Sequence, residues 1–442
     1  MVTETPGTRA RTPLRAARWR RARRTLALAA LCALLPGCGT LYLMQAAGGE
    51  LRVLRAREPI ERVLADPHTP PELRERLEQV QAARKFASGE LHLPDNRSYR
   101  TYADIHRDFV VWNVVAAPEF SVEPKRWCFP VAGCVAYRGY FREQRAREFA
   151  NALAVQGFDV AIDGVPAYST LGRFADPVLS SMLRYGDDDL VATIFHELAH
   201  QLVYVRDDSE FNEAFATTVE DVGLERWLAH RGQPARMRAF REERSLDVKF
   251  VSLLTATRRH LARLYASGLE RDEMRYAKAE IFNRLIADIR ALENAAGLGM
   301  PLYEDWIGSG LNNARLASVA TYYDCVPGFM RVLEEQHDDL PRFYAAVRAL
   351  AAQPRAERHA RLCTVPERGI AQNTMPGRGG ARYSGSTASI GAGAMPRAAK
   401  PSSRQILSSV SERKLSSEKG FPGSSPMTTP CSRATQSGSA TM

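Results

Sequence analysis

Two histidines and one glutamate lie close together in the sequence H-E-L-A-H at residues 196–200. Residues four positions apart lie on one face of an α-helix, so the imidazoles of His196 and His200 can bind the same metal ion. Glu197 stands between them, where its carboxylate can take a proton from a water molecule bound to that metal. Four of the five residues 191–195 are apolar, as expected of a helix that enters a core. The pentapeptide therefore predicts a metal site with a general base.

A third metal ligand follows at Glu213, in the sequence F-N-E-A-F-A at residues 211–216. Catalytic zinc sites use three protein ligands and leave a fourth position to water. Residues 207–209 are typical of a turn and a helix cap, so a second, returning helix would bring Glu213 to the two histidines. Glu220 lies on the same face and is expected to hydrogen-bond a ligating histidine. These residues weaken the alternative of two unrelated histidines on a buried helix.

The two helical motifs resemble those of the gluzincin peptidases of the aminopeptidase N type, whose second helix carries a similar N-E-G-F-A sequence. The connection between the helices is shorter here by more than one helical turn. The G-x-M-E-N strand, by which those enzymes hold the free amine of a substrate, is absent. A closer resemblance is to the bacterial family of "putative aminopeptidase" lipoproteins. It extends over about residues 38–362 and includes residues 127–130, 137–141 and 168–176. This resemblance implies Zn2+ as cofactor and a peptide or protein as substrate.

The N-terminus predicts export. Residues 15–24 are basic, and residues 26–35 are ten apolar residues, too few to span a bilayer as a helix. The sequence L-P-G-C at residues 35–38 resembles a bacterial lipobox, with Cys38 as the lipid-modified first residue of the mature protein. We therefore expect residues 1–37 to be a signal peptide and Cys38 to anchor the protein to a membrane of the bacterial cell envelope, facing the periplasm. A cleaved signal without lipid is the alternative, and the choice between inner and outer membrane stays open.

The net charge of the chain is +10, but the charge is concentrated at its ends. Residues 1–24 and residues 365–442 each carry a net charge of +7, which leaves −4 for residues 25–364. A mildly acidic folded part gives no indication of a basic face for phosphates, so a nucleic-acid partner is not expected. Residues 365–442 are rich in Gly, Ser, Pro, Thr and Ala, and they are predicted to be a disordered low-complexity tail.

Residues 38–364 are predicted to form one zincin-like peptidase domain with an α+β, predominantly helical fold. Strand-like composition precedes the H-E-L-A-H helix, and helical patterns dominate afterwards. The expected strands cover residues 109–115, 134–140 and 160–165. The expected helical segments cover residues 51–86, 188–204, 210–231, 244–295 with a break near 267–268, and 312–362. The sequence thus predicts a small sheet before the metal-binding helix.

Three further expectations concern the surroundings of the metal. Residues 168–174 either hold an extended substrate as an added strand or form an ordinary loop, and they contain no carboxylate for a substrate ammonium group. Tyr322 is a candidate for stabilising the oxyanion, the alternative being a core tyrosine. Cys128 and Cys134 form a disulfide outside the cytoplasm or stay as free buried thiols.

The function predicted from the sequence is that of a zinc metallopeptidase, foremost an aminopeptidase, with endopeptidase activity left open. His196, His200 and Glu213 would bind Zn2+, and Glu197 would act as general base. A different class of function is also open: a non-catalytic envelope lipoprotein whose metal site is structural and which serves as a binding or interaction module.

Overall fold

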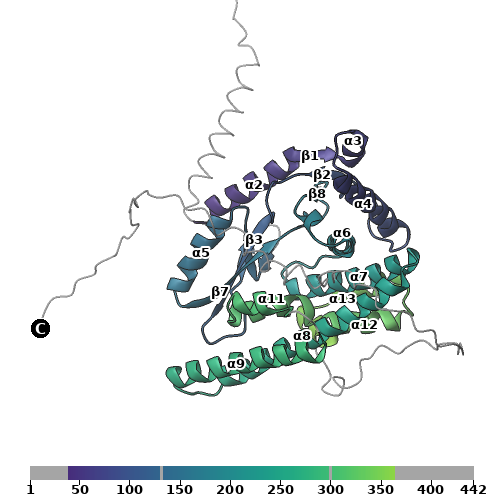
Figure 1. The fold of residues 1–442 in the computed structure, drawn as a ribbon. Helices are drawn as coiled ribbons and strands as arrows, with labels where there is room; N and C mark the ends of the chain where they lie inside the picture. Colours follow the sequence, from purple (N-terminus) through teal and green to yellow (C-terminus); the bar gives the residue numbers. More distant parts are fainter. Residues whose placement is uncertain (1–37, 130–132, 298–300, 364–442) are drawn as a thin grey trace, which may run out of the picture.

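The structure is a computed structural model that describes residues 38–129, 133–297 and 301–363 (Figure 1). The predicted signal peptide, residues 1–37, and the predicted tail, residues 365–442, lie outside the described residues. All the described residues lie within the predicted domain, residues 38–364. It is mostly helical with small sheets, which confirms the predicted α+β class.

The largest sheet has three antiparallel strands in the order β6-β3-β7. The strands are β3 (Val111–Pro118), β6 (Tyr137–Tyr140) and β7 (Phe158–Val165). Alternate residues of β3 point to opposite faces of the sheet. Val114 and Ala116 pack against helix α5 (Glu143–Val155), whereas Val115 and Ala117 pack against Ala314 of helix α11 (Asn313–Tyr323). The sheet is therefore covered by a helix on each face.

Two smaller β-structures lie beside this sheet. Strands β1 (Arg57–Pro59), β2 (Thr101–Ala103) and β8 (Val178–Leu179) form a three-stranded sheet in that order. Strands β4 (Trp127–Phe129) and β5 (Gly133–Val135) form a hairpin, which a disulfide between Cys128 and Cys134 closes. The predicted strand at residues 134–140 is therefore two strands, β5 and β6, because the first half pairs with β4 and the second with β3.

Most of the remaining chain is helical. The helices that have not yet been named are α2 (Cys38–Ala56), α3 (Ile60–Ala65), α4 (Pro71–Gly89), α6 (Asp187–Leu202), α7 (Ser209–His230), α8 (Pro234–Tyr265), α9 (Arg271–Ala295), α10 (Glu304–Gly308), α12 (Val326–Glu335), α13 (Leu340–Ala351) and α14 (Arg355–Leu362). The break predicted near residues 267–268 is present between α8 and α9, where Gly268 has a φ of +74°. These two helices form the long hairpin at the bottom of Figure 1.

Helix α6 lies in the middle of the main core. Every residue from 189 to 200 is buried, and α4 and α7 pack against the helix. Its apolar residues join one hydrophobic cluster with Phe211 and Phe215 of α7 and Phe329 of α12. Helices buried on all sides are normally apolar all round. The two histidines and the glutamate at residues 196–200 therefore lie in an environment where charged groups need specific partners.

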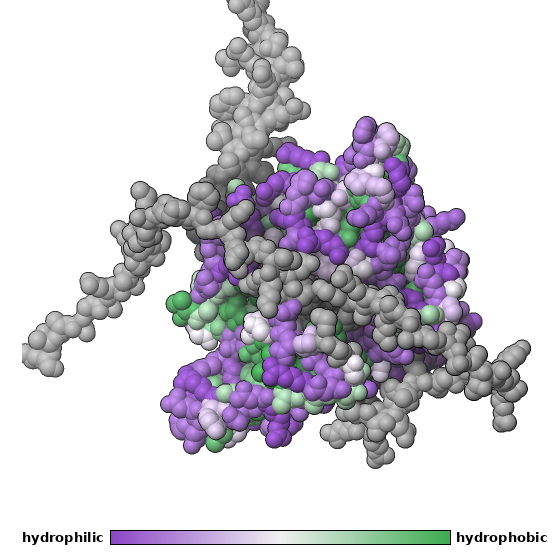
Figure 2. Space-filling view, in the orientation of Figure 1, coloured by the Kyte–Doolittle hydropathy of each residue, from purple (hydrophilic) through white to green (hydrophobic). Residues whose placement is uncertain are grey.

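No helix within residues 38–129, 133–297 and 301–363 has the length and apolar composition needed to cross a membrane. The face of the molecule seen in Figure 2 is mostly hydrophilic, with some apolar residues at its left edge. Cys38, the predicted lipidation site, is the first residue of α2.

Candidate metal centre

The residues in the first turn of α6 favour the start of a helix. Asp187, Asp188 and Asp189 lie at its N-terminus, where negative charge is favourable, and the backbone N–H of Gly186 donates to Asp189 Oδ2 at 3.1 Å. The helix continues without interruption to Leu202. His196 and His200 consequently lie one turn apart, with their Nε2 atoms separated by 3.2 Å.

The chain then reverses direction within residues 203–208. Asn212 fixes this turn, because its side chain accepts from Val205 N and donates to Val205 O, each at 2.7 Å. Asp208 caps α7 by accepting from Phe211 N at 3.3 Å. Helix α7 packs along α6 and places Glu213 Oε2 at 3.4 Å from His196 Nε2 and 3.5 Å from His200 Nε2.

The three side chains fit a zinc ion. Their ligand atoms form a nearly equilateral triangle with sides of 3.2, 3.4 and 3.5 Å. Ligands about 2.0–2.1 Å from a tetrahedral zinc ion lie about 3.3–3.4 Å apart. Two imidazole nitrogens and one carboxylate oxygen are also a donor set that zinc accepts, with one position left for a further ligand. The sequence prediction that these residues converge agrees with this geometry.

Glu220 lies on the far side of His196 from the triangle. Its Oε2 is 2.9 Å from His196 Nδ1. A carboxylate there accepts a hydrogen bond from Nδ1–H, which leaves Nε2 unprotonated and able to bind a metal ion. Nδ1 of His200 is buried and has no hydrogen-bond partner among the described residues. Asp221, the next residue along α7, pairs instead with Arg244.

The neighbouring charges and hydrogen bonds shift the pKa values of Glu213 and His196. Burial by itself raises the pKa of the Glu213 carboxyl, but the charge of His200 and the hydrogen bonds from both imidazoles bring it down to about 2. Burial lowers the pKa of His196, and the hydrogen bonds with Glu213 and Glu220 more than reverse this effect, so that the pKa lies well above its usual range. The cluster therefore holds strongly coupled charges in a buried place.

Glu197 is 6% exposed and lies in the same electrostatic environment. Burial raises its pKa, and the charges of His196 and His200 offset that rise only in part. A carboxyl whose pKa moves towards neutrality is better matched to taking up and returning a proton. No Arg or Lys of the described residues forms an ion pair with Glu197.

Two tyrosines interact electrostatically with Glu213 and Glu197. Burial raises the pKa of Tyr322, followed by the negative charge of Glu213 and of other neighbours that include Glu197. Burial and the same two glutamates also raise the pKa of Tyr137, on β6. The sequence predicted Tyr322 for this region and missed Tyr137. The only signal for Tyr137 was its place within residues 137–141, one of the segments that carry the family resemblance.

Residues 168–174 form a loop rather than a strand. Leu171 and Gly172 have φ values of +57° and +72°, which an extended strand does not allow. The loop lies near the end of the metal-binding helix, because Ser169 Oγ is 3.5 Å from Nε2 of Gln201, the residue after His200. Of the two alternatives left open by the sequence, a substrate-holding strand or an ordinary loop, the backbone shows the loop.

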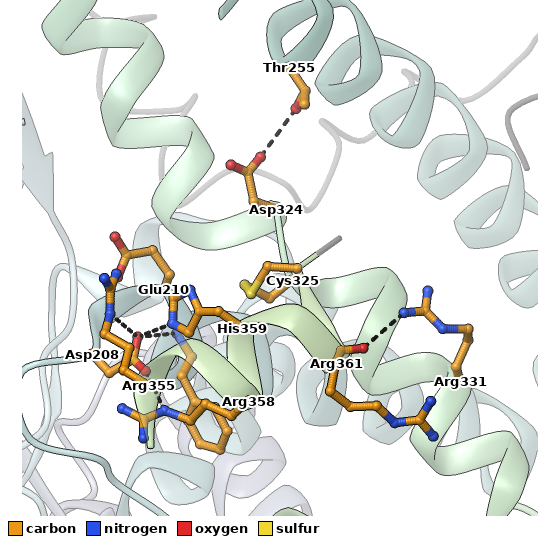
Figure 3. Close-up of a disulfide and its surroundings, with 12 residues drawn as sticks. Asp208, Glu210, Thr255, Asp324, Cys325, Arg331, Arg355, Arg358, His359 and Arg361 are labelled. Carbon is orange, nitrogen blue, oxygen red and sulfur yellow. Dashed lines mark hydrogen bonds and ion pairs between the residues drawn. A yellow bond between two sulfur atoms is a disulfide. The ribbon is translucent and has the colours of Figure 1, made fainter. Parts of the chain in front are cut away.

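Two other groups in the described residues combine His with Cys or acidic side chains, but other bonds already engage them. Cys325 and Cys363 form a disulfide, so neither offers a thiolate (Figure 3). Asp208 is bound by Arg358 Nε at 2.6 Å and by His359 Nε2 at 2.7 Å. The triangle on α6 and α7 is the metal-capable group whose donor atoms are free to bind.

Comparisons with known proteins identify the family of the chain. The family model described as "Putative aminopeptidase" matches residues 41–362, which include the candidate metal triangle, the sheet and all the helices from α3 to α14. No curated protein and no solved structure matches the chain. The match covers most of the chain, and the protein therefore belongs to the putative aminopeptidase family.

Proposed function

We propose that this protein is a zinc metallopeptidase with a zincin-like site, and that it removes residues from the N-terminus of peptides. The observation that carries the proposal is the triangle of His196 Nε2, His200 Nε2 and Glu213 Oε2, whose sides match a tetrahedral zinc site. The family match supports peptidase activity, and the donor chemistry supports zinc.

The residues around the triangle have separate tasks. A bound zinc ion supplies a Lewis acid and lowers the pKa of water to about 7. Glu197 takes a proton from the attacking water and gives it to the leaving nitrogen. Glu220 keeps the His196 ring in the orientation that presents Nε2. The phenol of Tyr322 stays protonated at neutral pH, so it can donate a hydrogen bond to the oxyanion.

The place of action follows from the N-terminus. We propose that Cys38 carries a lipid and that the protein faces the periplasm from a membrane of the bacterial envelope. Helix α2 begins at this residue, so a lipid there would attach directly to a helix of the folded domain. Peptides or exported proteins would then be the substrates. Labelling with a radioactive fatty acid, lost in Cys38→Ala, tests the anchor.

Metal content tests the proposed function. Purified protein is expected to contain one zinc ion per chain, and Glu213→Ala is expected to lose it, because two ligands remain of three. Glu225→Ala on the same helix is the control, because Glu225 pairs with exposed Arg241 away from the triangle. Absence of bound metal after zinc supplementation contradicts the proposal. One zinc ion without hydrolysis of any unblocked peptide would favour the alternative of a non-catalytic lipoprotein with a structural metal.

A further inference from the structure

A second group of buried oxygen atoms lies close enough to Glu197 to interact with it electrostatically. It combines Tyr99, which precedes β2, Asp176, which precedes β8, and Glu50 of α2. Tyr99 N donates to Asp176 O at 2.6 Å. The phenol of Tyr99 interacts electrostatically with both Glu197 and Asp176, and Asp176 interacts with Glu50. The group therefore extends from the proposed general base towards α2.

These oxygens have unused capacity for hydrogen bonds. Tyr99 is 1% exposed, and its phenol oxygen has no hydrogen-bond partner with full geometry, although the Ser169 side chain is near it. Oε1 of Glu50 is also buried without a partner, while its Oε2 accepts from Tyr168. Asp176 accepts from Thr170 N at 3.0 Å and from Thr170 Oγ1 at 2.6 Å, and it also has a hydrogen bond with the Ser169 side chain, which leaves a lone pair on one of its oxygens. Buried polar atoms without partners are costly, which points to a missing ligand.

The group also lacks a paired cation. Neither Glu50 nor Asp176 forms an ion pair with an Arg, Lys or His of the described residues. Arg57 is close enough to affect Glu50, but its guanidinium donates to Ala175 O. Arg107 affects Tyr168 and donates to backbone oxygens of Val110 and Phe141. Burial raises the pKa of Glu50, and it raises the pKa of Asp176 to about 6. A cationic ligand would remove this unfavourable burial of negative charge.

The backbone of Tyr99 adds an independent observation. Its φ is +60°, in the left-handed region that costs a bulky residue about 1–2 kcal/mol. Neighbouring bonds hold this conformation: Ser98 N donates to Asn96 Oδ1 at 2.9 Å, and Arg84 Nε donates to Ser98 O at 3.1 Å. Such strain is found where a side chain must be held in one place for function. A purely structural role of Asp176 in bracing its loop explains neither the strain nor the free oxygens of Tyr99 and Glu50.

We propose that Glu50, Asp176 and Tyr99 bind the alkylammonium group of a peptide substrate. An alkylammonium has three N–H donors, and each of the three residues offers an oxygen with a free lone pair. The free amine at a peptide N-terminus and the side chain of a lysine both carry this group. The proposal rests on the proposed peptidase function. The sequence lacks the G-x-M-E-N strand that holds the substrate amine in aminopeptidase N-type enzymes. Glu50 of α2 and Asp176 would supply the carboxylates for the amine instead.

The test compares three forms of one short peptide amide on the zinc-loaded mature protein: a free N-terminus, an acetylated N-terminus, and an acetylated N-terminus with lysine as first residue. The free amine is expected to be preferred over the acetylated form by at least about tenfold in kcat/KM, since a site with buried polar groups rejects a ligand that leaves them unpaired. Glu50→Gln is expected to lower kcat/KM for the free amine about tenfold, mainly through KM, and to leave the acetylated peptide unchanged. If the lysine form is as good as the free amine, the side-chain ammonium is the ligand.

Two further variants sharpen this test. Tyr99→Phe removes only the phenol oxygen and is expected to shift KM for the free amine in the same direction by a smaller factor. Glu90→Gln, an exposed residue at the end of α4, is the matched control for charge and is expected to behave as wild type. Equal effects of Glu50→Gln on free and acetylated peptides would overturn the proposal, because a structural defect acts on both.

Equilibrium binding separates this proposal from the proposed function. Calorimetric titration of the Glu197→Gln protein with the free and acetylated peptides measures amine recognition without turnover. Preferential binding of the free amine that Glu50→Gln abolishes supports the proposal even where the wild type hydrolyses nothing, and equal binding overturns it. A second metal ion per chain that Glu50→Gln removes would also overturn it, because the cation would then be a metal.

Discussion

Two buried clusters at α7 contain similar side chains but differ in charge: in one the carboxylates face only histidines, and in the other the carboxylate is paired with arginine and histidine. Glu213 and Glu220 face the imidazoles of α6, and no Arg or Lys of the described residues forms an ion pair with either glutamate. Asp208, at the N-terminus of the same helix, is bound by Arg358 and His359 of α14 (Figure 3). The side chain of Asp208 is completely buried. Both clusters thus place a carboxylate beside histidine within the core.

The comparison indicates that a buried carboxylate can bind a cation from outside only where the chain does not already supply one. The chain supplies its own cations to Asp208, and so that cluster is complete and holds the start of α7 against α14. The disulfide between Cys325 and Cys363 ties the end of α14 to the start of α12, which keeps these cations in place. Around Glu213 the positive charge must come from protonated histidine or from a metal ion. The second cluster positions the helix, whereas the first is the one that we propose to bind zinc.

The largest effect is expected for Glu197→Gln. The substitution keeps the size of the side chain but removes the proton acceptor, and general acid–base groups contribute about 10²–10⁴-fold to rate. We expect kcat to fall by about 10³-fold while the protein keeps one zinc ion per chain. Steady-state kinetics on a free-amine peptide, together with metal analysis of the same sample, measure both quantities. Unchanged turnover would remove Glu197 from the mechanism.

The next effect tests whether the Asp208 cluster is purely structural. Asn is as good a helix cap as Asp, so Asp208→Asn removes the charge and keeps the cap. Arg358 is 6% exposed and would lose its partner, and an unpaired buried charge costs about 3–5 kcal/mol. We expect the free energy of unfolding to fall by about 3 kcal/mol, measured by urea denaturation. Zinc affinity should change little; a parallel loss of zinc would show that the two clusters are not independent. Glu210→Gln, beside exposed Arg355, is the control.

A smaller effect is expected for Glu220→Gln. The variant can still accept a hydrogen bond from His196 Nδ1, but it loses the negative charge that strengthens the ring as a ligand. Changes of this kind weaken metal binding by about 10–100-fold. Competition with a chromophoric zinc chelator measures the affinity. Asp221→Asn, one residue further and paired with Arg244, is expected to keep wild-type affinity, and the reverse ranking would contradict the role of Glu220.

The smallest effect is a dependence of stability on pH. Burial raises the pKa of Asp208, but His359 and Arg358 bring it down to about 2, below its unfolded value of about 3.8. A carboxyl with a depressed pKa contributes stability above its unfolded pKa and loses it as pH falls through the folded pKa. The stability gap between wild type and Asp208→Asn should be constant from pH 7 to 5 and shrink by up to about 2 kcal/mol between pH 4 and 2. Urea denaturation at each pH tests this, and a constant gap down to pH 2 would contradict the charge pairing.

The residues of the candidate metal triangle could be predicted from the sequence because they are brought together by local structure. His196 and His200 need only helical periodicity, and Glu213 needs only a short turn and a second helix. The boundaries of α6 and α7 were predicted within two residues. The break between α8 and α9 was also marked locally, by Gly268.

The segments that the sequence left open or divided wrongly have conformations that depend on distant partners. Residues 168–174 have a strand-like start, but the loop is held by Asp176 and lies beside Gln201. Residues 134–140 divide between two sheets because a disulfide ties their first half to β4. The disulfide between Cys325 and Cys363 was not predicted, since nothing in the spacing of these cysteines relates α12 to α14.

By itself, the sequence determined the candidate metal-site motif, the α+β class and the order of the helices, because hydrogen bonding and side-chain periodicity act over a few residues. Only the tertiary structure decided which charges are compensated. Arg358 and His359 lie about 150 positions from Asp208, and Glu50, Tyr99 and Asp176 come from three separate segments. Such encounters depend on how helices pack around a shared core, which no local pattern encodes.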